Sequence, residues 1–138
     1  MYHPTTKQEL QDIVEALLIN GTKDLNCIDV SKIEDFSELF KDKDMTDVDI
    51  SNWDVSNGKQ FNSMFMRCKD LTSDFSYWSL DSVEDAKYMF LNCYKLNKPP
   101  KLSSMNLTPE CYTGMFSSCT SLTKAPDLPA TELKDGCY

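Results

Sequence analysis

Apolar residues recur along most of this chain with a period of about 25 residues. Each period contains a phenylalanine that directly follows Leu or Met, at Phe40, Phe65, Phe90 and Phe116. A cysteine lies three residues after each of the last three phenylalanines, and a leucine lies three residues after each of those cysteines. Four units in a shared phase predict stacked repeats, because a unit of this length cannot bury its own apolar side.

Each repeat combines two patterns. In the first half, apolar residues are spaced by three or four, which is typical of one face of a helix. The sequences SKIE (31–34) and TPE (108–110) favour helix starts there. After the cysteine the pattern becomes extended: residues 45–50 alternate as in a strand, and residues 71–76, 96–102 and 122–128 are less regular. The pattern therefore predicts one short helix and one short parallel strand in each repeat.

Residues 1–24 do not follow this period. They carry an amphipathic stripe that begins near Thr5 or Thr6 and ends at Asn20-Gly21. The apolar positions of this stripe are Leu10, Ile13, Val14, Leu17 and Leu18. We expect a capping helix in residues 1–24, followed by four repeats in residues 25–138 within the same structural domain. The predicted fold class is an α/β repeat solenoid, similar to leucine-rich repeats.

The last residues repeat an earlier passage. The ending LPATELKDGCY corresponds to LSSMNLTPECY, 26 residues before it. We expect this half-repeat to pack on the preceding repeat, with Cys137 and Tyr138 over Cys111 and Tyr112, and to act as a lid. Dimerisation at this end is the alternative if its edge stays unpaired.

Composition limits the function. Of the 138 residues, 41% are hydrophobic and 26% are charged, and the formal net charge is -8. This charge argues against general binding of nucleic acid or anionic membranes, which requires clustered Lys and Arg. No apolar run is long enough to span a membrane, and the first residues lack the pattern of a secretory signal. We therefore expect a cytoplasmic protein, or a cell-surface location if the chain is part of a longer exported protein.

Two passages resemble a known family. The stretch DISNWDVSNGKQFNSMFMRCKDL resembles the repeat of BspA-like leucine-rich-repeat proteins of bacterial surfaces, and CYTGMFSSCTSLTKAPDLPATEL is similar to a second variety of that repeat. The resemblance covers about residues 25–138. It implies a leucine-rich-repeat-like fold and binding of other macromolecules, and it transfers no catalytic residues.

Several side-chain groups are candidates for chemistry. The cysteine column at Cys68, Cys93 and Cys119 is compatible with a disulfide or metal site, but its recurrence favours buried, reduced thiols. The recurrence of Trp53 and Trp78 likewise favours a core position over a ligand-binding aromatic box. The acidic run at residues 42–49 lacks the glycine and distal glutamate of a calcium loop, so a solvated face is favoured. With one histidine and no catalytic motif, we expect neither an enzyme nor a cofactor or metal site.

The non-repeating polar positions are the candidates for function. If the extended segments line one face, the charge on that face changes from acidic to basic along the stack. The candidate partner-binding residues are Asp47, Asp49, Ser73, Lys98 and Lys124. We expect a protein-interaction module that binds a protein partner, since complementary charge steers association. One alternative is a small acidic inhibitor of phage or mobile-element type, which blocks a basic nucleic-acid-binding cleft of a host complex. Another is a fragment of a bacterial surface adhesin.

Overall fold

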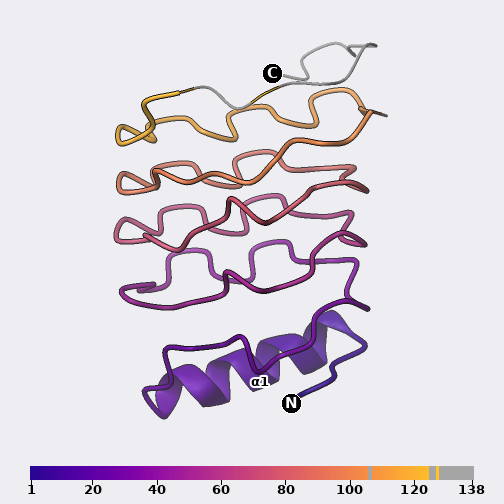
Figure 1. Ribbon diagram of the computed structural model, residues 1–138, viewed down its shortest axis with the longest axis vertical. Helices are drawn as coiled ribbons and strands as arrows, with labels where there is room; N and C mark the ends of the chain where they lie inside the picture. Colours follow the sequence, from indigo (N-terminus) through magenta and orange to yellow (C-terminus); the bar gives the residue numbers. More distant parts are fainter. Residues whose placement is uncertain (106, 125–126, 128–138) are drawn as a thin grey trace.

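The described part of the chain winds into a stack of flattened coils above one helix. The computed structural model describes residues 1–105, 107–124 and 127. The helix α1 (Lys7–Ile19) lies at the lower end, and each later coil lies on the one before it (Figure 1). Within the described residues, adjacent coils are joined by isolated parallel β-bridges, such as Asp35 with Gln60 and Gln60 with Asp85.

The predicted α/β repeat solenoid is wrong. Among the described residues, α1 is the only helix, and the contacts of strand type are single bridges that form no sheet. Apolar residues in each repeat do have the spacing of a helix face, but the backbone there forms turns instead of a helix. Each phenylalanine segment folds as consecutive turns, which we call a turn ribbon. The four ribbons are residues 36–43, 61–68, 86–93 and 112–119.

A turn ribbon repeats every four residues. In the first ribbon, the N–H of Leu39 donates to the carbonyl of Phe36 (3.3 Å), and the N–H of Lys43 donates to that of Phe40 (2.9 Å). The third residue of each of these turns has a positive φ: 57° at Glu38 and 61° at Asp42. A positive φ at this position is typical of a type II turn. Because the ribbon period is four, apolar residues spaced by four still point to one side.

Every second amide of the ribbon connects it to the next coil. The N–H of Phe36 donates to the carbonyl of Gln60 (2.7 Å), that of Glu38 to Asn62 (3.1 Å), and that of Phe40 to Met64 (2.9 Å). The same alternation links the second ribbon to the third and the third to the fourth. In an α-helix these amides would donate to the carbonyl four residues earlier. A ribbon within a stack satisfies its backbone by sharing amides with its neighbour.

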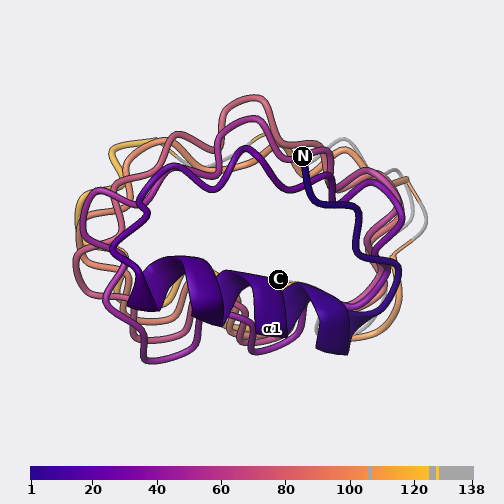
Figure 2. The ribbon, with the colours of Figure 1, turned by 90° about the horizontal axis from the view of Figure 1, so that it is seen from below.

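Helix α1 was predicted correctly from its pattern. Thr6 is the N-cap, and a capping box joins its hydroxyl oxygen to the N–H of Glu9 and the Glu9 carboxylate to the backbone of Thr6. Asn20 is the C-cap, and Gly21 follows with a φ of 81°. The side chains of Leu10 and Val14 are buried. Seen from below, α1 lies across the lower end of the stack (Figure 2).

The core consists of aromatic columns that run through the stack. Phe40, Phe65, Phe90 and Phe116 form one column, with ring centroids 5.5, 5.2 and 5.7 Å apart in successive pairs. Trp53 and Trp78 stack with centroids 6.4 Å apart. Their indole N–H groups donate to the carbonyls of Leu25 and Ile50 in the coil below, at 2.9 and 3.1 Å. The expectation that the recurring aromatic residues form the core is confirmed.

The helix starts predicted at residues 31–34 and 108–110 and the strand predicted at residues 45–50 were wrong. At residues 31–34, the N–H of Ser31 donates to the Asp29 carboxylate, and the carbonyl of Glu34 accepts from the next coil, so no helix begins there. Residues 108–111 form one turn, with a φ of 59° at Glu110. Residues 45–48, predicted to be extended, also form a turn.

The predicted lid at residues 128–138 lies outside the described residues. None of the described helices is both apolar enough and long enough for a membrane span.

Candidate functional site

Aspartates occupy the corners of the coils through a recurring Asp-x-Ser/Thr motif. In each motif the carboxylate accepts a hydrogen bond from the N–H two residues later, which is an Asx turn. The pairs are Asp29 with Ser31, Asp35 with Ser37, Asp44 with Thr46, Asp49 with Ser51, Asp54 with Ser56 and Asp74 with Ser76. Many of the aspartates therefore have a structural role, because they close turns. Hydrogen bonds from Ser31 and then from His3 lower the pKa of Asp29 to about 2.

Four charged residues on successive coils form what we call the charged column: Asp24, Asp49, Asp74 and Lys98. A parallel bridge pairs Asp24 with Asp49. In the upper part, the N–H of Phe75 donates to the carbonyl of Lys98 (3.0 Å), and Lys98 Nζ lies 3.6 Å from the Asp74 carboxylate. The column thus carries three carboxylates below and an ammonium group above.

Two carboxylates of the column, those of Asp49 and Asp74, are held in their charged form. Hydrogen bonds from Ser51 lower the pKa of Asp49, although the negative charge of Asp74 opposes this shift. Hydrogen bonds from Ser76, followed by the charge of Lys98, lower the pKa of Asp74. Both groups are therefore ionised at neutral pH, and their side chains keep fixed positions because each also closes an Asx turn.

A pocket of about 500 Å³ lies at the basic end of the column. Its lining includes Pro99, Pro100 and Leu102 as apolar groups, and Asn97, Lys101 and Lys124 as polar groups. Within the described residues, Lys101 and Lys124 make no ion pair, in contrast to Lys98, which pairs with Asp74. Asp127 also lines the pocket, so two ammonium groups face one carboxylate beside an apolar floor. The excess of positive charge suits an anionic group carried on an apolar stem.

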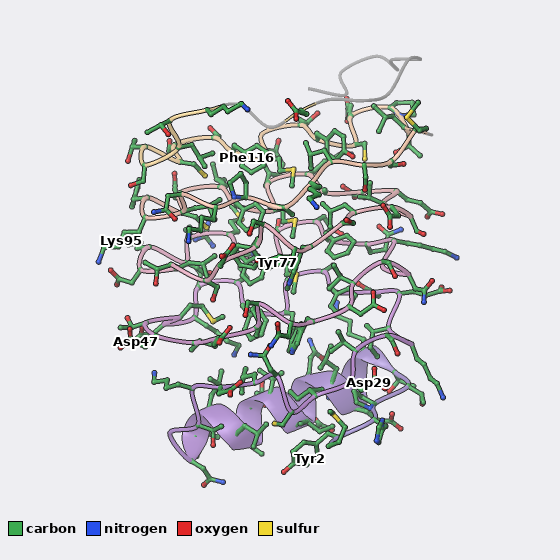
Figure 3. All side chains as sticks on the ribbon, in the orientation of Figure 1. Tyr2, Asp29, Asp47, Tyr77, Lys95 and Phe116 are labelled. Carbon is green, nitrogen blue, oxygen red and sulfur yellow. The ribbon has the colours of Figure 1, made fainter. Side chains whose placement is uncertain are left out.

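The structure brings together only some of the predicted partner-binding residues. Asp49 and Lys98 belong to the charged column, and Lys124 lines the adjoining pocket. Asp47 is exposed, with a φ of 59°, at a corner on the same side of the view as Lys95 (Figure 3). Ser73 is half-buried, and its hydroxyl donates to the carbonyl of Val48 in the coil below, which is a structural role.

Sequence reasoning missed Asp24, Asp74 and Lys101. The signal for Asp74 was present, because the motif DIS at residues 49–51 recurs one repeat later as DFS at 74–76. Lys101 had no comparable signal. Its place in the pocket depends on how residues 97–103 pass the coil below. The period is irregular there, because Ser79 is bridged to Lys101, which lies less than one full repeat away.

The cysteine column is a buried structural feature. The thiols of Cys68, Cys93 and Cys119 donate to the carbonyls of Phe40, Phe65 and Phe90 of the coil below, each at 3.0 Å. Burial raises the pKa of Cys68 to about 12 and that of Cys119 to about 11, and it also raises that of Cys93. Such thiols are poor nucleophiles and poor metal ligands.

The acidic run at residues 42–49 is divided among separate structural contacts. Asp42 pairs with Arg67 through two hydrogen bonds, at 2.5 and 2.8 Å, while Asp44 closes its own Asx turn. Among the described residues, no three or more His, Cys, Asp or Glu side chains are grouped so that they could hold a metal ion.

Comparison with known proteins gives one finding. The model of the family described as "Mycoplasma protein of unknown function, DUF285" matches residues 8–128. Neither the comparison with curated proteins nor that with solved structures returns a match. The matched region includes nearly all of α1, all four turn ribbons and the charged column. The chain therefore belongs to the DUF285 family.

Proposed function

We propose that this chain is a non-enzymatic protein-interaction module, and that it binds a protein partner through the charged column and the adjoining pocket. The observation that carries this proposal is the fixed order of charges on successive coils, from Asp24, Asp49 and Asp74 to Lys98. Because each of these carboxylates is oriented by hydrogen bonds, the column loses little side-chain freedom on binding.

The charges define the chemistry of the partner. A complementary segment carries basic groups opposite Asp49 and Asp74. It carries an acidic group that enters the pocket beside Lys101 and Lys124. Such an arrangement fixes the direction in which the partner lies, since the reversed direction would place like charges together.

The test separates charge from structure. An Asn side chain keeps an oxygen that can accept the Asx hydrogen bond, so the double variant Asp49→Asn/Asp74→Asn removes two charges from the column and retains both turns. The matched control is Asp44→Asn/Asp54→Asn, which changes the net charge equally at corners outside the column. Using the intact chain as bait, we expect capture of the partner to weaken with the first variant and to stay unchanged with the control. Equal loss with both variants, or loss with neither, would reject the column as the binding surface.

One observation favours the inhibitor of a basic nucleic-acid-binding cleft as a second candidate. Residues 1–95 contain 18 Asp and Glu against 10 Lys and Arg, a net charge of -8, whereas the described residues from 96 onward carry two acids and three lysines. A basic cleft would bind the lower coils. This candidate requires a partner whose capture is abolished by high salt and by added nucleic acid.

A place at the bacterial surface is a further proposal. The resemblance of residues 25–138 to BspA-like repeats supports it, and so does the repeat length of 25 or 26 residues. A cytoplasmic location is the alternative proposal. Fractionation of cells that express the natural gene distinguishes the two.

A further inference from the structure

We propose that Tyr77 is the anchor of the partner-binding surface, and that its ring binds an arginine side chain of the protein partner. The inference rests on the proposed function, because this arginine is one of the basic groups expected opposite Asp49 and Asp74. It adds the residue that contributes most to binding and the kind of cation that fits there.

Tyr77 is the most exposed aromatic side chain of the described residues, with 80% of its surface accessible. It lies midway up the stack (Figure 3), at the third position of a turn in which the N–H of Trp78 donates to the carbonyl of Phe75 (2.9 Å). Within the described chain, its ring makes no aromatic contact and its hydroxyl makes no hydrogen bond. The ring therefore contributes little to the core.

The repeat does not require an aromatic residue at this position. One and two coils below, the corresponding residues are Asn52 and Cys27. At the next position, by contrast, the buried Trp53 recurs as the buried Trp78. Tyrosine is enriched among the residues that dominate binding energy at interfaces. An exposed tyrosine that the repeat does not need thus indicates binding rather than packing.

The coil above leaves the ring uncovered. Asp74 pairs with Lys98 of that coil, and Ser79 is bridged to Lys101. Between these two contacts the third coil has four residues, whereas the coil above has two, Pro99-Pro100. The longer segment must project from the wall as a turn, so the ring lies outside the path of the shorter segment above it.

The ring adjoins the charged column. The Asp74 carboxylate accepts a hydrogen bond from the N–H of Ser76 (2.9 Å), the residue directly before Tyr77. Asp49 lies one coil below, and among the described residues neither Asp49 nor Asp24 makes an ion pair. Negative charge is therefore in excess beside the ring, and charge complementarity selects a cation as the occupant.

An arginine fits this combination better than a lysine. The guanidinium group is planar, so its face can stack on a tyrosine ring while the N–H groups at its edge donate to carboxylates. A lysine ammonium is a point charge without such a face. The fold already holds one arginine across two coils, because Arg67 donates to both carboxylate oxygens of Asp42, at 2.5 and 2.8 Å.

The experiment titrates the full chain with two blocked peptides, acetyl-Gly-Arg-Gly-amide and acetyl-Gly-Lys-Gly-amide, and follows binding by NMR. Stacking on the ring predicts an upfield shift of the arginine δ-CH2 protons. We expect the arginine peptide to bind about threefold more tightly than the lysine peptide. Tyr77→Ala should abolish this preference, whereas Tyr77→Phe should keep it because the ring face remains.

A second tyrosine provides the matched control. Tyr94 is 40% exposed and precedes Lys95, at a corner away from Tyr77 (Figure 3). Tyr94→Ala should bind both peptides as the parent does. No upfield shift, equal binding of the two peptides by the parent, or an arginine preference that survives Tyr77→Ala would each overturn the inference.

Capture of the partner by the intact chain separates this inference from the proposed function. We expect Tyr77→Ala to lose the partner, as the variant Asp49→Asn/Asp74→Asn does, while Tyr94→Ala retains it. If the aspartate variant loses the partner and Tyr77→Ala retains it, the column is the binding surface and Tyr77 is not its anchor. Loss of the partner with Tyr94→Ala as well would also overturn the role of Tyr77.

Discussion

Helix α1 and the first turn ribbon have the same apolar spacing but different backbones. Leu10 and Val14 are four residues apart, as are Phe36 and Phe40, and all four side chains are buried in one core. In α1 every interior amide donates within the helix, while in the ribbon every second amide donates to the coil above. The spacing specifies which side chains face the core. Whether an adjacent coil supplies carbonyl oxygens decides how the backbone hydrogen bonds are completed.

The position in the stack explains the difference. A ribbon needs a partner coil that supplies carbonyl oxygens, whereas a helix completes most of its own hydrogen bonds. Helix α1 can therefore lie at the lower end without presenting an open ladder, and Lys7 joins it to the first ribbon through Ser37 Oγ (2.7 Å). Helix α1 protects one end of the stack in the way that a cap protects other repeat arrays.

The largest expected effect comes from the aromatic column. Phe65 is completely buried and stacks between Phe40 and Phe90. We expect Phe65→Ala to lower the free energy of unfolding by about 3 to 5 kcal/mol, measured by urea denaturation. Exposed Ile19, at the end of α1, provides the control, because Ile19→Ala removes no core contact. A loss at Phe65 no larger than at Ile19 would show that the column is not the core.

The next effect tests how position 58 and the Phe61 ring of the second ribbon share space. A Cβ added to Gly58 would lie 2.3 Å from the Phe61 ring. Gly58→Val should therefore cost about 1 to 3 kcal/mol of stability. The coil above carries the opposite combination at the equivalent positions, Val83 with Ala86. Gly58→Val/Phe61→Ala should thus be more stable than the sum of the two single effects predicts. Strict additivity in this double-mutant cycle would contradict the shared space.

A substitution to glycine should have opposite signs in the two regions. Ser63, in the second ribbon, has a positive φ, in the left-handed region that favours glycine. Ser63→Gly should stabilise the protein by about 1 kcal/mol, because a left-handed backbone is strained for any residue with a Cβ. Ala16→Gly in α1 should destabilise it by about 1 kcal/mol, because glycine is a poor helix residue. Thermal unfolding of both variants measures the difference, and destabilisation by both would place Ser63 in a helix.

The smallest effects concern the Asx turns. The pKa values of Asp29, Asp44 and Asp74 are lower in the folded protein than in the unfolded chain, mainly because Ser or Thr donates to each carboxylate. Groups of this kind stabilise the fold above their unfolded pKa, and the contribution disappears as the pH falls from about 4 towards 2. Asp29→Asn/Asp44→Asn should reduce the loss of stability over this pH range. An unchanged pH dependence would show that these aspartates are not held by their turns.

The sequence indicated some of these features and concealed others. The period, the aromatic columns, the buried cysteines and α1 all follow from which residues are apolar. The ribbon does not, because the spacing Phe36, Leu39, Phe40 fits a helix and two linked turns equally well. The ribbon residues with positive φ did not indicate the turns either. Eight ribbon positions have a positive φ, and only one of them, Gly114, is a glycine; the others include Glu38, Arg67 and Tyr88.

The candidate site was partly predictable because the repeats can be aligned in the sequence. The change of charge from Asp49 to Lys98 is visible in the sequence once the repeats are aligned. The exclusion of Asp47 and Ser73 from the column is not visible, because their side-chain positions depend on the turn at residues 45–48 and on the contact of Ser73 with the coil below.

The acceptor of the Phe65 amide tests the central claim most directly. The N–H of Phe65 donates to the carbonyl of Met89 in the next coil, at 2.9 Å. An NMR experiment that detects scalar coupling across hydrogen bonds identifies this acceptor directly. We predict a coupling from Phe65 nitrogen to the Met89 carbonyl carbon. A coupling to the Phe61 carbonyl carbon instead would show that the segment is helical and would contradict the turn-ribbon account.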